Sequence, residues 1–269
     1  PLGHAPAQRQ GSGMRRLHIV GCPRSGTTLC MELVSTCFAN SGCCEHEVSI
    51  FEPVNAAGGP YITKQPNDIK QLRHIFHRDQ GLYVIYVGRD PRAVITSQHR
   101  ARPGQYFCNY RVWLECDSAA RAYVGHDRFL ALRYEDLVTE PDTVQERIRS
   151  HFPALRQLHS FSEYHRFAQP SAGSLQAMNG LRAVNRESLD RWRQHLPRIA
   201  EQYRRHPVLA DDLVRLDYEP DKGWLACLDG IAGTVYPCRY PERREHFKEW
   251  EKALRSYLKS RRYLRSLAD

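Results

Sequence analysis

The chain has 269 residues, of which 41% are hydrophobic and 26% are charged. These proportions are typical of a globular protein and exclude a mostly disordered chain. No apolar run approaches the roughly 18 residues that a membrane-spanning helix needs, so we expect no transmembrane segment. Lys and Arg outnumber Asp and Glu by 39 to 30, a formal net charge of +9, which predicts an anionic partner.

The N-terminal segment is small, polar and rich in Gly and Pro, and Met14 then leads into an apolar stretch. We interpret residues 1–13 as a remnant of processing or cloning and Met14 as the native start. If the chain starts at Met14, we expect it to have no signal peptide. The expected compartment is therefore the cytoplasm, or an organelle lumen if the chain was trimmed.

Nine cysteines, an odd number without a Cys-x-x-Cys pair, are expected to be mostly reduced and buried. Cys227 and Cys238 flank a predicted hairpin at 229–236, and they could pair in an oxidising environment. The thirteen His residues are scattered without the His-x-x-x-His spacing of a helical zinc site, so no metal is expected.

Short apolar runs alternate with segments of helical spacing over the first 150 residues. Strands are predicted at 16–21, 82–87 and 129–133, with a further short strand at 48–51. Helices are predicted at 28–38, 67–78, 91–98, 112–123 and 141–151. This alternation predicts an α/β fold of three layers, P-loop-like, with a central, mostly parallel sheet flanked by helices.

The pattern changes from about residue 155, where the chain becomes rich in Arg, His, Gln and Ser and then helical. Helices are predicted at 188–205 and 208–216, and a basic amphipathic helix or helix pair at 243–267. We therefore expect one domain over 14–222, followed by a C-terminal extension over 223–269 that contains the hairpin and the basic helix.

The first predicted strand ends in a glycine-rich turn that leads directly into a helix. Such a turn is an anion cradle, because glycines admit the ligand and the amide hydrogens and helix dipole favour negative charge. The spacing is that of a P-loop, except that Thr27 stands where the Lys of nucleotide hydrolases is expected. The predicted phosphate-binding residues are Cys22, Pro23, Arg24, Ser25, Gly26, Thr27 and Thr28.

A second motif follows the strand predicted at 82–87. Arg89 comes at the carboxyl end of that strand, where open α/β sheets bind ligands, and Ser97 lies two turns into the next helix. A guanidinium and a hydroxyl placed in this way could hold a second phosphate. Taken alone, Arg89 and Asp90 could equally form a surface ion pair.

Together the two motifs resemble those of sulfotransferases that use 3′-phosphoadenosine 5′-phosphosulfate (PAPS). The Pro23–Thr28 turn resembles their 5′-phosphosulfate loop, and the stretch from Arg89 to Ser97 resembles their 3′-phosphate motif. The resemblance covers about residues 15–220. It implies PAPS as donor, its 3′,5′-bisphosphate PAP as product, and transfer without a metal ion. Because this donor is not a triphosphate, the resemblance also explains why the loop has no P-loop Lys.

The spacing is most similar to that of tyrosylprotein and carbohydrate sulfotransferases, in which a catalytic Glu follows the loop Arg by 21 residues. Counted from Arg24, this resemblance implies Glu45 as the general base. Lys64-Gln65-Pro66 stands 25 residues before Arg89 and resembles their Lys-x-Pro. The implied catalytic residues are thus Glu45, Arg24 and Lys64.

Two downstream segments resemble elements that contact the nucleotide in this family. Gly180-Leu181-Arg182 resembles the segment that folds over the cofactor, and Arg191-Trp192 resembles a Lys/Arg-Trp element. Arg182 and Arg191 are therefore implied as cofactor ligands. A family Ser beside the bridging oxygen falls near Ser174, where the local match is weak.

The chemistry of sulfuryl transfer independently requires such residues. A base must take the proton of the acceptor, and a partly desolvated Glu can do so. Cations must neutralise the leaving phosphate, which suits Arg24 and Lys64. His46, Glu47 and Glu52 lie close to Glu45 in the sequence and remain alternative bases.

Two functions other than sulfuryl transfer are alternatives: a kinase and a nucleic-acid-binding protein. A P-loop kinase of a small metabolite would need the missing Lys and an acid for magnesium, for which Asp90 is a doubtful candidate. A nucleic-acid-binding protein is suggested only by the charge and the basic C-terminal segment. The acceptor could be a tyrosine peptide, a glycan, a lipid or a small natural product, and the chain could form a homodimer.

Overall fold

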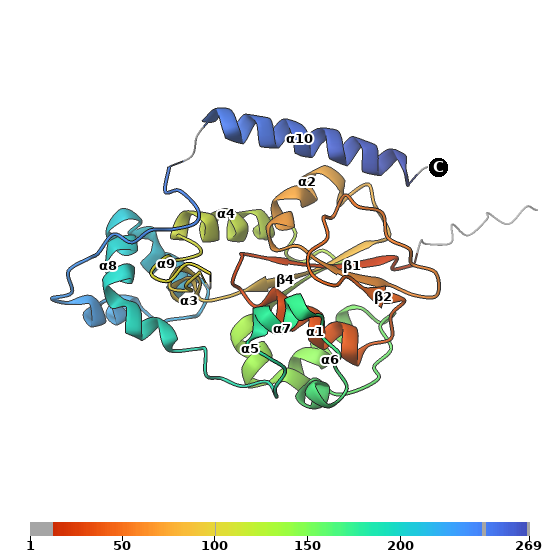
Figure 1. The fold of residues 1–269 in the computed structure, drawn as a ribbon, viewed down its shortest axis with the longest axis horizontal. Coiled ribbons are helices and arrows are strands. Elements are labelled where there is room, and N and C mark those ends of the chain that lie inside the picture. Colours follow the sequence, from red (N-terminus) through yellow and green to blue (C-terminus); the bar gives the residue numbers. More distant parts are fainter. Residues whose placement is uncertain (1–12, 100, 244–245, 268–269) are drawn as a thin grey trace, which may run out of the picture.

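The computed structural model describes residues 13–99, 101–243 and 246–267, without the side chains of residues 246–248 (Figure 1). The interpretation of residues 1–13 as a remnant therefore falls outside the described residues, apart from Gly13.

The centre of the fold is a five-stranded sheet in which every pair of neighbouring strands is parallel. The strand order is β2 (Gly42–Cys43), β3 (Tyr61–Lys64), β1 (Arg16–Gly21), β4 (Leu82–Gly88) and β5 (Phe129–Arg133). After β1 the chain builds one side of the sheet and then crosses to the other side. The carboxyl end of β1 is therefore the switch point at which such sheets bind ligands.

Side chains of β1 point alternately into two separate cores, as the period of a strand requires. Leu17 and Ile19 pack with Leu33 of α1 (Thr27–Cys37), whereas Val20 packs with Trp113 of α4 (Tyr110–Arg121). Helices thus cover both faces of the sheet (Figure 1). The predicted α/β fold with a parallel central sheet is confirmed.

The other helices follow in chain order. They are α2 (Leu72–Ile75), α3 (Pro91–Ile95), α5 (Tyr134–Thr139), α6 (Pro141–His151), α7 (Ala172–Met178), α8 (Leu196–Arg205), α9 (Val208–Arg215) and α10 (His246–Arg265). Four 3₁₀ helices are described: η1 (Pro66–Gln71), η2 (Phe161–Arg166), η3 (Arg191–His195) and η4 (Lys222–Leu228). The helix predicted at 67–78 is therefore divided into η1 and α2, and the one predicted at 188–205 into η3 and α8.

The strand predicted at 48–51 is wrong, because this segment is a loop that wraps the buried side chain of Arg16. The Arg16 guanidinium donates hydrogen bonds to the backbone oxygens of Ser49, Ile50 and Glu52. Those carbonyls are consequently not available for a strand ladder. The strands on this side of β1 are instead β3 and the two-residue β2.

The predicted hairpin at 229–236 is also not formed, since this stretch contains no strand. Cys238 instead forms an isolated parallel bridge with Tyr106, and the backbone N–H of Tyr106 donates to the carbonyl of Pro237. This segment is thus tied to the domain rather than folded on itself. Cys227 and Cys238 both carry free thiols.

The basic C-terminal helix is a single helix, α10, that lies outside α2 (Figure 1). Its C-terminal half is held by Tyr263, whose buried hydroxyl donates to Asp79 Oδ2 over 2.7 Å. Among the helices that the structure describes, none is long and apolar enough to cross a membrane.

Candidate functional site

The turn after β1 is a tight loop that leads directly into helix α1. Arg24 and Gly26 both have left-handed backbones, with φ of 76° and 96°, which fold residues 22–26 into a tight loop. Helix α1 begins directly at Thr27, and Gly26, which precedes it, has no side chain to cap it. The amides and positive dipole end of α1 are therefore directed toward the loop.

The two glycines of this loop are required by their surroundings. A Cβ on Gly21 would lie 2.6 Å from the carbonyl oxygen of Val87, and one on Gly26 would lie 2.2 Å from the ring of Tyr134. The loop is thus enclosed by β4 on one side and by Tyr134 on the other. The Cys22 thiol faces the core, where burial raises its pKa well above the usual value.

The glycine-rich loop and the second motif are in direct contact. Arg24 Nε donates to Ser97 Oγ over 2.7 Å, and the Arg89 guanidinium donates to the backbone oxygen of Arg24 over 3.0 Å. The two motifs lie 65 to 73 residues apart in the chain, yet they form one basic site at the carboxyl edge of the sheet.

Arg89 is held by residues that sequence reasoning did not assign to the site. Its guanidinium carbon lies 4.1 Å from the centroid of the Tyr134 ring, and its Nη2 donates to the backbone oxygen of Ser188. The Trp113 indole donates to the Arg89 carbonyl over 2.9 Å, which fixes the backbone there.

Lys64 supplies an ammonium group beside the loop, which lacks the Lys of a P-loop. It ends β3, its side chain is only 1% exposed, and its Nζ donates to Thr28 Oγ1 over 3.0 Å. Its Nζ also lies 3.4 Å from the Glu47 carboxylate. A strand adjacent to β1 thus places an ammonium group at the first turn of α1, although Thr27 occupies the usual Lys position.

The carboxylate beside Lys64 belongs to Glu47, one of the alternative bases, and not to Glu45. Glu45 is exposed, and its backbone oxygen accepts a hydrogen bond from the Ser171 hydroxyl. The ring of His46 lies against Gly173 at the start of α7. Glu52 is exposed and contributes its backbone oxygen to Arg16.

Glu32 is a second carboxyl group close to Lys64, and the sequence analysis did not single it out. It is 6% exposed, and burial raises its pKa, while nearby Ser174 and Lys64 act to lower it. Its position four residues after Thr28, on the same face of α1, is a signal that could have found it. Ser174, only weakly matched in sequence, is thereby brought to the site.

Arg182 and Arg191 make local contacts at the surface. Arg182 donates to the backbone oxygens of Met178 and Asn179, and Arg191 pairs with Glu187 at 3.5 Å. Their roles as cofactor ligands stay predictions. Among the described residues, no group of three or more His, Cys, Asp or Glu is arranged to hold a metal ion.

A scan against protein-family models found no match, and a search of curated proteins found none either. Comparison with solved structures returns sulfotransferases. The sulfotransferase domain of the Synechococcus PCC 7002 olefin synthase has 18% identity and a TM-score of 0.47, covering 69% of this chain and 89% of that one.

Two further structures are similar at the same level. The sulfotransferase domain of the curacin biosynthetic pathway has 17% identity and a TM-score of 0.49, covering 66% of this chain and 90% of that one. A mouse sulfotransferase complexed with PAP has 15% identity and a TM-score of 0.48, covering 81% of this chain and 90% of that one. The likeness to these three structures concerns the fold.

Proposed function

We propose that this protein is a PAPS-dependent sulfotransferase, which transfers a sulfuryl group to a hydroxyl or amine acceptor. The observation that carries the proposal is the contact between the two anion-binding motifs, through Arg24 with Ser97 and Arg89 with the Arg24 backbone. One continuous basic site suits a donor that carries a phosphosulfate at one end and a separate phosphate nearby.

The residues fit such a donor. The 5′-phosphosulfate would be held by the loop amides, the first turn of α1, Arg24 and Lys64, and the 3′-phosphate by Arg89 and Ser97. Ser25 Oγ and Arg89 Nε are two of several buried side-chain atoms that have no hydrogen-bond partner within the described residues. Buried polar groups of this kind are rarely left unpaired, and anionic oxygens would satisfy them.

The donor supplies an activated sulfuryl group whose leaving group is a phosphate. In the proposed reaction the acceptor oxygen or nitrogen forms a bond to sulfur while the bond from sulfur to the bridging oxygen breaks. Arg24 and Lys64 neutralise the charge that develops on that oxygen, and the general base takes the acceptor proton.

We assign the base to Glu47 rather than to Glu45. The Glu47 carboxylate lies 3.4 Å from Lys64 Nζ, which in turn contacts Thr28 at the loop. Its side chain is 34% exposed, so an acceptor can approach it from solvent. Geometry comes first in choosing a general base, and the hydrogen bond from Ser171 to the exposed Glu45 reaches only its backbone oxygen.

The kinase alternative is less well supported. The carboxylate of Asp90, the doubtful magnesium ligand, accepts from the Arg92 guanidinium at 2.7 Å and caps α3 by accepting from the Arg92 backbone N–H. An acid engaged in this way is not available for magnesium without breaking a buried ion pair. Binding of nucleic acid is checked by the DNA arm of the experiment described next.

The test compares thermal stabilisation by PAP, by ATP with magnesium, and by duplex DNA, followed by transfer from radiolabelled PAPS to a panel of peptide, glycan, lipid and small-molecule acceptors. We expect stabilisation by PAP and label transfer to at least one acceptor class. Stabilisation by ATP with magnesium but not by PAP would overturn the proposal in favour of a kinase, and stabilisation by DNA alone would overturn it in favour of a nucleic-acid-binding protein.

A further inference from the structure

Helix α10 carries a continuous row of exposed apolar side chains. Trp250, Leu254, Tyr257 and Leu258 are 62%, 42%, 47% and 58% exposed. Their spacing of i, i+4, i+7 and i+8 places them on one face of the helix. We call these four residues the apolar stripe.

The stripe faces away from the protein body. The residues that anchor the helix are Ser260 and Tyr263, both 3% exposed, and they lie on another face. Tyr263 also contacts the ring of Phe51, in addition to its bond with Asp79. The helix thus lies on the outside of α2 (Figure 1), and the exposed fractions of the apolar stripe show that its side chains are open to the surroundings.

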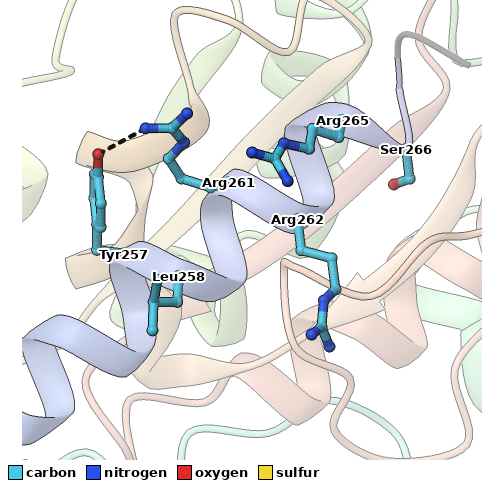
Figure 2. Close-up of a pocket in the computed structure, with 6 residues that line it drawn as sticks. All are labelled: Tyr257, Leu258, Arg261, Arg262, Arg265 and Ser266. Carbon is cyan, nitrogen blue, oxygen red and sulfur yellow. Dashed lines mark hydrogen bonds between the residues drawn. The ribbon is translucent and has the colours of Figure 1, made fainter.

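Cations border the apolar stripe along its length. Residues 249–267 include six Lys or Arg and two Glu, and the two Glu pair with Lys252 and Arg255 within the helix. Figure 2 shows the hollow beside Tyr257, with Arg261 hydrogen-bonded to the Tyr257 hydroxyl and Arg265 one turn further on. Arg78, from the turn after α2, adds a cation beside Arg261 and Arg265.

We propose that α10 docks on an anionic lipid surface, with the apolar stripe inserted among the acyl chains and the flanking cations on the head groups. A helix of this kind, with Trp and Leu on one face and Lys and Arg beside them, lies in the plane of a membrane interface. Each cation near an anionic bilayer adds to binding, and each buried apolar side chain adds further.

Two other occupants fit the surface less well. A second copy of the helix would bring a strongly cationic surface against itself, and both nearby Glu residues are already paired. A free acidic polymer would match the cations but would leave Trp250, Leu254 and Leu258 in water. Both apolar area and positive charge are matched at once by an anionic bilayer.

The test is sedimentation of the whole protein with vesicles of phosphatidylcholine, alone or with about 30% phosphatidylserine. We expect binding to the anionic vesicles and weakening by salt. The triple variant R255Q/K259Q/R262Q should bind them about a hundredfold more weakly. The triple variant W250S/L254S/L258S should lose about tenfold or more.

Matched variants control for the loss of charge and of apolar surface elsewhere. R149Q/R166Q/K222Q removes three exposed, ion-paired cations, and V124S/V208S/V235S removes three exposed apolar side chains, all outside α10. Both should bind vesicles like the parent protein. Equal binding of all variants, or no preference for anionic vesicles, would overturn the proposal. So would light scattering that shows a dimer dissociated by the stripe variant, because a second copy would then occupy the stripe.

Discussion

Arg24 Nε donates a 2.7 Å hydrogen bond to Ser97 Oγ, which joins the glycine-rich loop after β1 to the segment just beyond α3. Helix α3 ends at Ile95, so Ser97 lies outside it, contrary to the helix predicted at 91–98. The bond holds a side chain whose own backbone is left-handed, with φ of 76°. Arg24 is thereby positioned before any ligand arrives. Preorganised donors of this kind need no rearrangement when charge develops on a ligand.

Removal of the hydroxyl in Ser97→Ala should weaken PAP binding about tenfold, because one hydrogen bond to a charged group is lost. Isothermal titration calorimetry with PAP measures the change. Ser118→Ala is the matched control, since Ser118 also accepts from an arginine, Arg121, but on the exposed surface of α4. Equal affinities in the two variants would contradict a role for the Arg24–Ser97 contact.

The choice of base can be tested with two isosteric variants. Glu47→Gln should reduce kcat by about a hundredfold or more while PAP affinity stays within a few-fold, because only the proton acceptor is removed. Glu45→Gln should retain most of the activity. Single-turnover transfer from labelled PAPS measures both, and the reverse order of the two variants would return the base role to Glu45.

Lys64→Met should lower kcat by about a hundredfold, because the cation beside Thr28 and Glu47 is lost while the aliphatic stem is kept. Lys70→Met is the matched control, since Lys70 pairs with Glu115 at 3.2 Å in a partly exposed position. The control should be active. A Lys64→Met enzyme with unchanged kcat and raised KM alone would assign Lys64 to donor binding rather than to the chemical step.

The close contact between the loop and the Tyr134 ring predicts that one added methyl group at Gly26 strongly affects PAP binding. Gly26→Ala should abolish PAP binding, because its Cβ would lie 2.2 Å from the Tyr134 ring. Gly125 has a similar φ of 88°, but a Cβ added there would meet nothing within 4 Å. Gly125→Ala therefore isolates the backbone strain, which costs about 1–2 kcal/mol. Urea unfolding and calorimetry with PAP distinguish the clash from the strain.

His18 should make the protein less stable in mild acid. Burial lowers its pKa to about 4, with Arg16 acting in the same direction and Asp68 against it. The unfolded chain takes up the proton near the ordinary value of about 6.5, so acidification from there toward pH 4 favours unfolding by up to about 3 kcal/mol. His18→Gln should show a smaller loss in urea unfolding over this range, and an equal loss would contradict the assignment.

Much of the fold was predictable, because its signals are local. The apolar runs at 16–21, 82–87 and 129–133 became β1, β4 and β5, and the alternation with helices predicted the parallel sheet. The strand at 48–51 failed for a non-local reason. Its carbonyls bind the side chain of Arg16, more than thirty residues earlier, and no window around the segment contains that partner.

The sequence by itself determined the two motifs that we propose bind the donor's anionic groups, and the absence of the P-loop Lys, because strand, glycine turn and helix N-terminus are properties of adjacent residues. Only the tertiary structure decided which cation and which carboxylate lie together beside the loop. The pairing of β3 with β1 brings Lys64 to Thr28, and the loop that wraps Arg16 then presents Glu47 to Lys64 in place of Glu45. Counting along the chain cannot find such a contact, because it depends on how distant strands pair.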